Sequence, residues 1–213
     1  MKYLIIVLSI VLSCNGSLYA QCDIQKLAPE PKIKSFNYFG YSSSLSSKNL
    51  IVNEPNNDSL AYNAGIINVF KKVNQKWEIF QKLTTSQVNS NQQLGNHLKA
   101  IDSLIVASGN VNRNTSNSDA LFIYRQHKTG SWPGKETEVF YLEKDLAENS
   151  YIRILEMDLN NEENLAVIYR KFDGFSSQLI IKILDLNSHS VLAEEILDKK
   201  DRFFYGIHTD VLL

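Results

Sequence analysis

The chain repeats its own pattern of motifs. A bulky hydrophobic residue and a glycine, Phe39-Gly40 and later Leu94-Gly95, precede an apolar triplet by ten or nine residues. The triplets are Leu50-Ile51-Val52 and Leu104-Ile105-Val106, which begin 54 residues apart. Self-similarity at a nearly fixed spacing restricts a chain to folds that stack one structural unit on the next.

The segments after the two triplets also agree. A polar stretch follows each triplet, at 53–63 and 108–118. We expect both stretches to be long loops that carry binding residues, because loops vary freely on a rigid scaffold. An apolar run comes next and then a tryptophan, Trp77 or Trp132. The shared position indicates that both tryptophans pack inside the repeated unit.

A third and looser copy begins near Tyr151 and has its triplet at 165–167, which is 61 residues after the second triplet. The start of a fourth copy lies at Phe204-Tyr205-Gly206. Each complete copy has room for four strands joined by turns. Repetition of four-stranded units at about 50 residues is typical of β-propellers.

Local patterns favour strands over helices. Apolar runs such as Leu179–Leu184 are short and rich in β-branched residues, and clusters of Asn, Asp, Ser and Gly bound them. No long stretch after the first twenty residues has the three-to-four periodicity of an amphipathic helix. We therefore predict an all-β fold of β-propeller-like blades, each with four antiparallel strands.

We predict three blades, at about 36–88, 89–147 and 148–200, and one strand of a fourth at 201–213. Closed propellers typically have about four to eight blades. Two interpretations therefore stay open: the chain is a fragment of a longer protein, or it forms an open arc. An open arc would expose blade faces and strand edges, which favours self-association or further blades as partners.

The first copy resembles a known family. Residues 39–46 begin with Phe-Gly, residues 49–58 contain the apolar triplet and a polar loop, and residues 65–70 form an apolar strand after a glycine. This order resembles the FG-GAP repeat of bacterial, integrin α-like β-propellers, although Asn53 and Glu54 stand where that family has Gly-Ala. The resemblance weakens in the later copies. It implies an extracellular propeller used for adhesion or ligand binding, and no particular ligand.

The first twenty residues have the pattern of a secretory signal peptide. Lys2 is followed by an apolar run, Tyr3–Leu12, that is too short to span a bilayer. We predict cleavage after Ala20, a short N-terminal tail at 21–35, and a secreted or cell-surface protein. A lipoprotein cut before Cys14 is the competing interpretation.

The charge distribution excludes some classes of partner. The formal net charge is −1, and acidic and basic residues are interspersed along the chain without a basic stripe or a polybasic helix. This pattern argues against binding to nucleic acid or to an anionic membrane surface. We expect no stable membrane span in the mature chain, and the expected ligand is an extracellular protein or a glycan.

Metal binding has one candidate. Asp158, Asn160 and Glu162 alternate as the oxygen ligands of calcium loops do, but Glu163 occupies the position where such loops need glycine. A solvated hairpin is the alternative. We expect no cofactor unless this turn binds calcium.

No catalytic constellation emerges from the sequence. The four histidines are scattered without the paired spacing of a zinc site, and no glycine-rich phosphate loop is present. Adjacent carboxylates such as Glu194-Glu195 point to opposite faces of a strand or lie in turns. We therefore predict a non-catalytic secreted or cell-surface binding or adhesion module and no enzyme. The alternative is a structural N-terminal fragment of a larger envelope or surface protein, with no ligand of its own.

Overall fold

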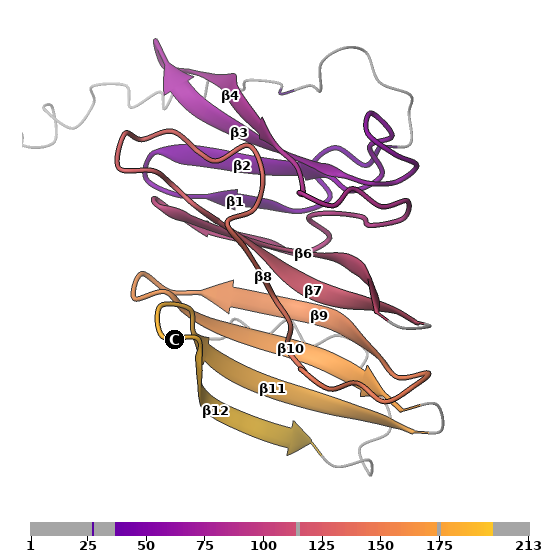
Figure 1. The fold of residues 1–213 in the computed structure, drawn as a ribbon. Coiled ribbons are helices and arrows are strands. Elements are labelled where there is room, and N and C mark those ends of the chain that lie inside the picture. The colour runs from indigo at the N-terminus through magenta and orange to yellow at the C-terminus, as the bar shows by residue number, and fades with distance from the viewer. Residues whose placement is uncertain (1–26, 28–36, 114–115, 174–175, 198–213) are drawn as a thin grey trace, which may run out of the picture.

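The computed structural model describes residue 27 and residues 37–113, 116–173 and 176–197. These residues form twelve strands and no helix, arranged as three four-stranded antiparallel sheets, and none of the sheets closes into a barrel (Figure 1). The predicted all-β fold of open, four-stranded blades is confirmed. The predicted signal peptide, the N-terminal tail apart from residue 27, and the fourth copy at 201–213 lie outside the described residues.

Each sheet is a meander in which strands that follow one another in the chain pair side by side. Blade 1 consists of β1 (Ser43–Leu45), β2 (Asn49–Glu54), β3 (Ile66–Val73) and β4 (Lys76–Leu83). Blade 2 consists of β5 (Leu98–Ile101), β6 (Leu104–Arg113), β7 (Ser116–Arg125) and β8 (Glu138–Phe140). Blade 3 consists of β9 (Tyr151–Leu159), β10 (Asn164–Phe172), β11 (Ser177–Asp185) and β12 (Ser190–Leu197).

The three blades stack face to face in chain order, and blade 2 lies between its neighbours (Figure 1). Successive side chains of a strand point to opposite faces. Along β6, Ile105 and Ala107 therefore belong to the core shared with blade 1, whereas Leu104 and Val106 belong to the core shared with blade 3. Both faces of blade 2 are apolar and buried.

A hydrogen-bond pattern around two glycines relates blades 1 and 2. The N–H of Gly40 donates to the carbonyl of Asn53 at 2.9 Å, and the N–H of Gly95 donates to the carbonyl of Ser108 at 2.7 Å. Both glycines have positive φ, 80° and 90°. The structural repeat is therefore 55 residues, not the 54 obtained by aligning the apolar triplets.

This one-residue difference decides which way each side chain faces. In the 55-residue relation Ile51 corresponds to Val106, and both side chains pack toward the following blade. Aligning the triplets instead would equate Ile51 with Ile105, which packs toward the preceding blade. A slip of one residue exchanges the two faces of a strand.

One of the two predicted loops is wrong. The stretch 108–118 continues β6 and β7 as a long hairpin, in which Gly109 pairs with Ala120 and Asn112 pairs with Asn117. The other stretch, 53–63, begins with the last two residues of β2 and then leaves the sheet. Antiparallel pairing satisfies the backbone of these residues without requiring apolar side chains, so a polar stretch can continue a hairpin.

The two tryptophans do not occupy equivalent positions, which corrects a second expectation. Trp77 lies at the beginning of β4 and is partly exposed, opposite Lys72 of β3. Trp132 lies in the segment between β7 and β8, is only 3% exposed, and belongs to the core between blades 1 and 2. Only Trp132 contributes to packing between the blades.

No helix long and apolar enough to cross a membrane occurs among the residues that the structure describes.

The close approach of blade 1 to Gly95 generates a prediction. A Cβ at this position would lie 2.8 Å from Cβ of Asn53, whereas a Cβ at Gly130, which also has a positive φ, would meet no atom within 4 Å. Positive φ alone costs an alanine about 1 kcal/mol, and the clash in Gly95→Ala should cost about 1–3 kcal/mol more. Urea unfolding followed by tryptophan fluorescence measures both variants, and equal losses for Gly95→Ala and Gly130→Ala would contradict the argument.

Candidate functional site

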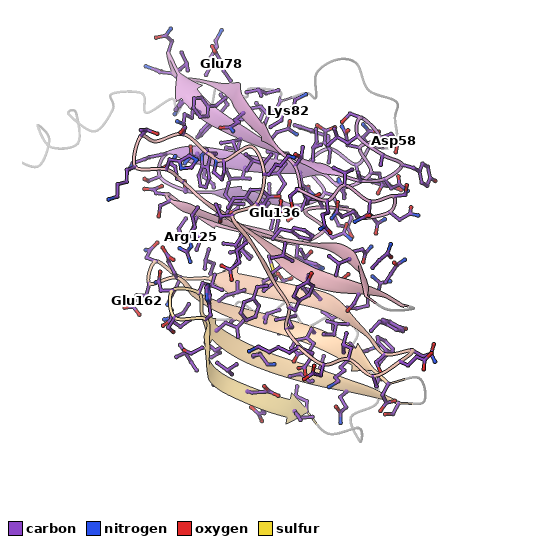
Figure 2. All side chains as sticks on the ribbon, viewed as in Figure 1. Asp58, Glu78, Lys82, Arg125, Glu136 and Glu162 are labelled. Atoms are coloured by element: carbon purple, nitrogen blue, oxygen red, sulfur yellow. The ribbon has the colours of Figure 1, made fainter. Side chains whose placement is uncertain are left out.

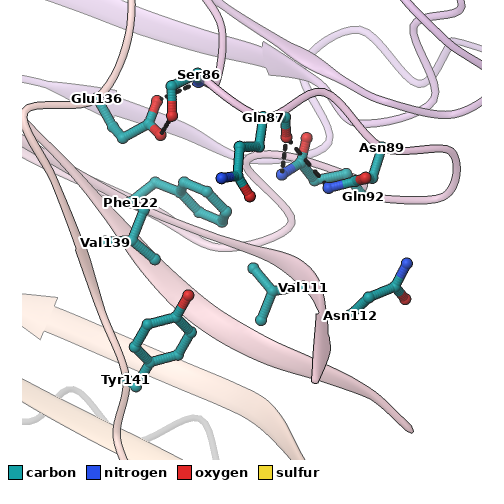
Figure 3. A pocket seen from close by; sticks show the side chains of 10 residues that line it. All are labelled: Ser86, Gln87, Asn89, Gln92, Val111, Asn112, Phe122, Glu136, Val139 and Tyr141. Carbon is teal, nitrogen blue, oxygen red and sulfur yellow. Dashed lines mark hydrogen bonds between the residues drawn. The ribbon is translucent and has the colours of Figure 1, made fainter. Parts of the chain in front are cut away.

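A cavity of about 240 Å³ opens between blades 1 and 2 (Figure 3). Its lining comes from three places in the chain. Ser86, Gln87, Asn89 and Gln92 belong to the connection from β4 to β5, Val111, Asn112 and Phe122 belong to the β6–β7 hairpin, and Glu136, Val139 and Tyr141 belong to the chain around β8. We call this cavity the interblade pocket.

A long segment from blade 2 forms one wall of the pocket. Residues 126–137 leave β7 and run along the outer strand of blade 1 before β8 begins. The side chain of Gln81 in β4 hydrogen-bonds to both the carbonyl (2.8 Å) and the N–H (3.3 Å) of Trp132. The N–H of Thr84 donates to the carbonyl of Gly134 at 3.0 Å. These contacts fix the strand-like path that carries Glu136 to the pocket.

Carboxamide groups dominate the polar lining. The carboxamides of Gln92 and Asn89 are held by hydrogen bonds within the protein. Nε2 of Gln92 donates to the carbonyl of Gln87 at 3.2 Å, and Oε1 of Gln92 accepts from the hydroxyl of Thr85 at 2.8 Å. Nδ2 of Asn89 donates to the same carbonyl at 3.3 Å. The side-chain amides of Gln87 and Asn112 form no hydrogen bond with the described residues, and that of Gln87 points toward the centre of the pocket (Figure 3).

Glu136 is the one carboxylate among the residues that line the pocket. It accepts hydrogen bonds from the N–H of Ser86 at 2.7 Å and from the hydroxyl of the same residue. Behind it, burial and the nearby Glu136 raise the pKa of Tyr124 well above its usual value, and the Tyr124 hydroxyl donates to the carbonyl of Thr84. These groups therefore have structural partners and do not form a general acid and base pair.

The apolar part of the pocket consists of Phe122, Val111, Val139 and the ring of Tyr141. Phe122 is only 2% exposed and forms part of the core between the blades, whereas Tyr141 is 41% exposed. Polar amides around a partly exposed aromatic ring can hydrogen-bond to and stack against a neutral ligand. The lining contains no histidine or cysteine.

Each of the three candidate calcium ligands, Asp158, Asn160 and Glu162, has a partner within the protein. Asp158 lies in β9 and forms an ion pair with Lys99 of blade 2 at 3.5 Å. Oδ1 of Asn160 accepts the N–H groups of Glu162 (3.0 Å) and Asn164 (2.9 Å). This arrangement is that of a capped hairpin turn.

Glu163, which stands where a calcium loop needs glycine, has a positive φ of 64°. Its carboxylate does not face the turn but forms an ion pair with Arg125 of blade 2, which also donates to the carbonyl of Leu186 at 2.8 Å. Figure 2 shows Arg125 and Glu162 on the left-hand side of the stacked blades. Among the described residues no group of three His, Cys, Asp or Glu side chains is arranged to hold a metal ion.

The predicted binding segment 53–63 contributes nothing to the interblade pocket. Its beginning is internal: Glu54 is fully buried and accepts hydrogen bonds from the amides of Asn57 (2.9 Å) and Asn68 (2.8 Å). The other predicted segment, 108–118, does contribute, through Val111 and Asn112. Phe122 lies in the repeated apolar run, whereas the remaining pocket residues lie between the repeated motifs, where the repeat pattern carries no information.

Two further groups of ionisable residues join blade 2 to blade 3. Asp119 of β7 accepts the N–H of Ile154 at 2.7 Å and pairs with Arg153 at 3.0 Å. Burial raises the pKa of Asp119, although its contacts with Ile154 and Arg153 act to lower it. Burial also lowers the pKa of the nearby His97. Since the hydrogen bonds of Asp119 go to the neighbouring blade, we assign this group to the joint between the blades.

Glu143, in the connection from β8 to β9, is the centre of the second group. It accepts the hydroxyl of Tyr169 at 2.6 Å and pairs with Lys171 at 3.4 Å and with Lys182 at 3.1 Å. The Lys182 side chain is only 6% exposed and also pairs with Glu194. Burial works to raise the pKa of Glu143, but Tyr169 and the lysines outweigh it and hold the pKa below its usual value.

The lowered pKa of Glu143 predicts an acid-dependent loss of stability. A carboxyl group whose pKa is lower in the folded state stabilises the fold above its usual pKa, near 4.5, and this contribution is lost as the pH falls through the lowered value. Glu143→Gln should therefore cost about 1 kcal/mol at pH 7, because the group keeps some solvent screening. The difference from the parent protein should shrink in acid.

Urea unfolding of both proteins between neutral pH and pH values below 4.5 tests this. Glu162→Gln in the exposed turn is the matched control and should behave like the parent protein. A stability difference that stayed constant as the pH fell would show that Glu143 does not act through its charge.

The fold and the pocket together define a class: an all-β protein of stacked four-stranded blades with an amide-rich pocket between two of them. No protein-family model and no curated protein matches this chain. The likeness to FG-GAP repeats thus depends on the residues of the first copy quoted above.

Proposed function

We propose that the protein is a non-catalytic, secreted or cell-surface binding module and that its ligand contacts the interblade pocket. The observation that carries the proposal is the pair of carboxamides, Gln87 and Asn112, that line the pocket without hydrogen bonds to the described residues. A polar group that can reach a ligand contributes affinity only when it is not already paired within the protein. The secreted location follows from the pattern of the first twenty residues.

The chemistry of the lining favours binding over catalysis. The carboxylate of Glu136 has its hydrogen bonds from Ser86, and the rest of the polar lining consists of side-chain amides, a serine hydroxyl and Tyr141. Such a lining matches hydroxyl or amide groups of a neutral ligand, as a glycan or a polypeptide segment would offer. It offers no activated nucleophile and no pair of carboxylates.

The test is a binding screen with two variants. The secreted chain is applied to an array of immobilised neutral and acidic oligosaccharides and to a panel of extracellular surface proteins. For any probe that binds, the double variant Gln87→Ala, Asn112→Ala should lower the affinity about tenfold or more, because it removes two hydrogen bonds of about 0.5–1.5 kcal/mol each. Asn187→Ala, which removes an exposed amide in the turn before β12, is the control.

Two results would contradict the proposal. One is an unchanged affinity of the double variant for a probe that the parent protein binds. The other is turnover of an oligosaccharide during the screen, since a hydrolytic activity would need groups that this pocket does not have.

The alternative function, a structural part of a larger surface assembly, is favoured by a different observation. One sheet face of blade 3 keeps apolar side chains that neither core covers. In that case the protein binds no probe in the screen, and its apolar face is where assembly occurs.

A further inference from the structure

One edge of β6 has a partner strand along only part of its length. On one side β7 pairs with all ten residues of β6, whereas β5 on the other side pairs only with Leu104–Ala107. The chain before β5 continues the pairing for a short distance. The N–H of Ser108 donates to the carbonyl of His97 at 2.8 Å. The N–H of Asn110 donates to the carbonyl of Gln92 at 2.6 Å, and the described residues make no further backbone pairing on this side. We call the part of this side at residues 110–112 the open edge of β6.

Three backbone groups on the open edge have no hydrogen-bond partner among the described residues. In a β-strand the N–H and C=O groups of alternate residues point to the same side. The N–H groups of Ser108 and Asn110 point toward the chain before β5, so the backbone groups of Asn112 point that way too. The carbonyl of Asn110 and both backbone groups of Asn112 can therefore pair with another strand.

The interblade pocket lies beside the open edge. Val111 and Asn112 both line the pocket (Figure 3), and Val111 also packs against the core between blades 1 and 2. The pocket volume of about 240 Å³ is smaller than the roughly 300–1,000 Å³ of sites that enclose a whole drug-sized ligand. The pocket therefore has room for one side chain of a larger ligand, with Phe122 and Val139 as further apolar walls.

We propose that the ligand of the pocket is a polypeptide segment that adds to the open edge of β6 as an extended strand. This inference rests on the proposed function, because it names the class of ligand for the same pocket. When a strand adds to a sheet edge, backbone hydrogen bonds provide affinity and a pocket for a side chain provides specificity. A glycan has no row of alternating N–H and C=O groups to match the edge.

The register of the added strand follows from the backbone groups. In an antiparallel arrangement the ligand residue opposite Asn112 exchanges both backbone hydrogen bonds with it. The next ligand residue lies opposite Val111. Side chains that lie opposite each other share one face of a sheet, so this residue directs its side chain to the face of Val111, where the pocket lies.

The pocket also selects the side chain that enters it. Phe122, Val111 and Val139 present apolar surface, and Glu136 is the one carboxylate in a lining that contains no lysine or arginine. An acidic side chain would be buried beside Glu136 without a cationic partner, which is unfavourable. An apolar side chain such as leucine fits the walls.

The experiment measures the binding of the secreted full chain to short synthetic peptides by isothermal titration calorimetry. The probes alternate threonine and serine around a central leucine, or around a central glutamate. The leucine peptide should bind about tenfold or more tightly than the glutamate peptide, because only the glutamate peptide buries a second carboxylate beside Glu136.

N-methylated forms of the leucine peptide test the strand pairing without altering the protein. N-methylation of one set of alternate backbone nitrogens removes the N–H groups that face β6 and should abolish binding. N-methylation of the other set changes groups that face away from β6 and should preserve binding. Equal effects of the two sets would overturn the proposal.

Two variants at one position test the open edge from the protein side. Asn112→Pro removes an N–H that faces away from β7, a position where a strand tolerates proline. Asn112→Ala is the matched control, since it removes the side-chain amide and keeps the N–H. Asn112→Pro should bind the leucine peptide about fivefold more weakly than Asn112→Ala, because it lacks one further hydrogen bond. Equal affinities of the two variants would overturn the proposal, and urea unfolding checks that both are folded.

Failure of this inference is distinguishable from failure of the proposed function. If no peptide binds, but an immobilised oligosaccharide binds with an affinity that depends on Gln87 and Asn112, the ligand is not a polypeptide and the proposed function stands. If neither peptides nor oligosaccharides depend on these two residues, both proposals are overturned.

Discussion

Blade 2 carries apolar side chains on both faces of its sheet, and burial of these two faces is what the rest of the structure depends on. Phe122 and Tyr124 of β7 enter the core with blade 1, whereas Leu121 and Ile123 of the same strand enter the core with blade 3. If blade 2 stood alone, it would expose both of these apolar faces to water. Stacking removes both faces from water, so the three blades form one continuous body of packed layers.

The interblade pocket follows from an irregularity in this stack. β4 has eight residues, but its counterpart β8 has only three, Glu138–Phe140. The segment that would have lengthened β8 instead crosses to blade 1 and inserts Trp132 into the core. The outer parts of blades 1 and 2 are therefore joined by side chains and single hydrogen bonds, not by a full strand, and a polar cavity remains beneath the crossing.

The sequence predicted strands because short β-branched runs bounded by turn residues are a local property, and it predicted their grouping in fours because the motifs repeat. The sequence did not predict the length of the repeat correctly, because that length depends on the turns between strands. The turn from β1 to β2 spans 46–48 and the turn from β5 to β6 spans only Asp102 and Ser103, so aligning the triplets missed the 55-residue relation by one. The pocket could not be predicted, since Gln87, Asn112 and Glu136 come from different blades and connections, and no spacing in the chain relates them.

Polar groups buried between the blades make the stack specific. The amide of Asn53 donates to the carbonyl of Gly95 in the next blade while its oxygen accepts the N–H of Ser42 in its own blade. At the second junction Asp119 accepts the N–H of Ile154. Apolar faces alone would allow two sheets to slide over one another at little cost. These polar groups are fully paired in one register only, so a displaced blade would leave them buried without partners, and the stack adopts a single arrangement.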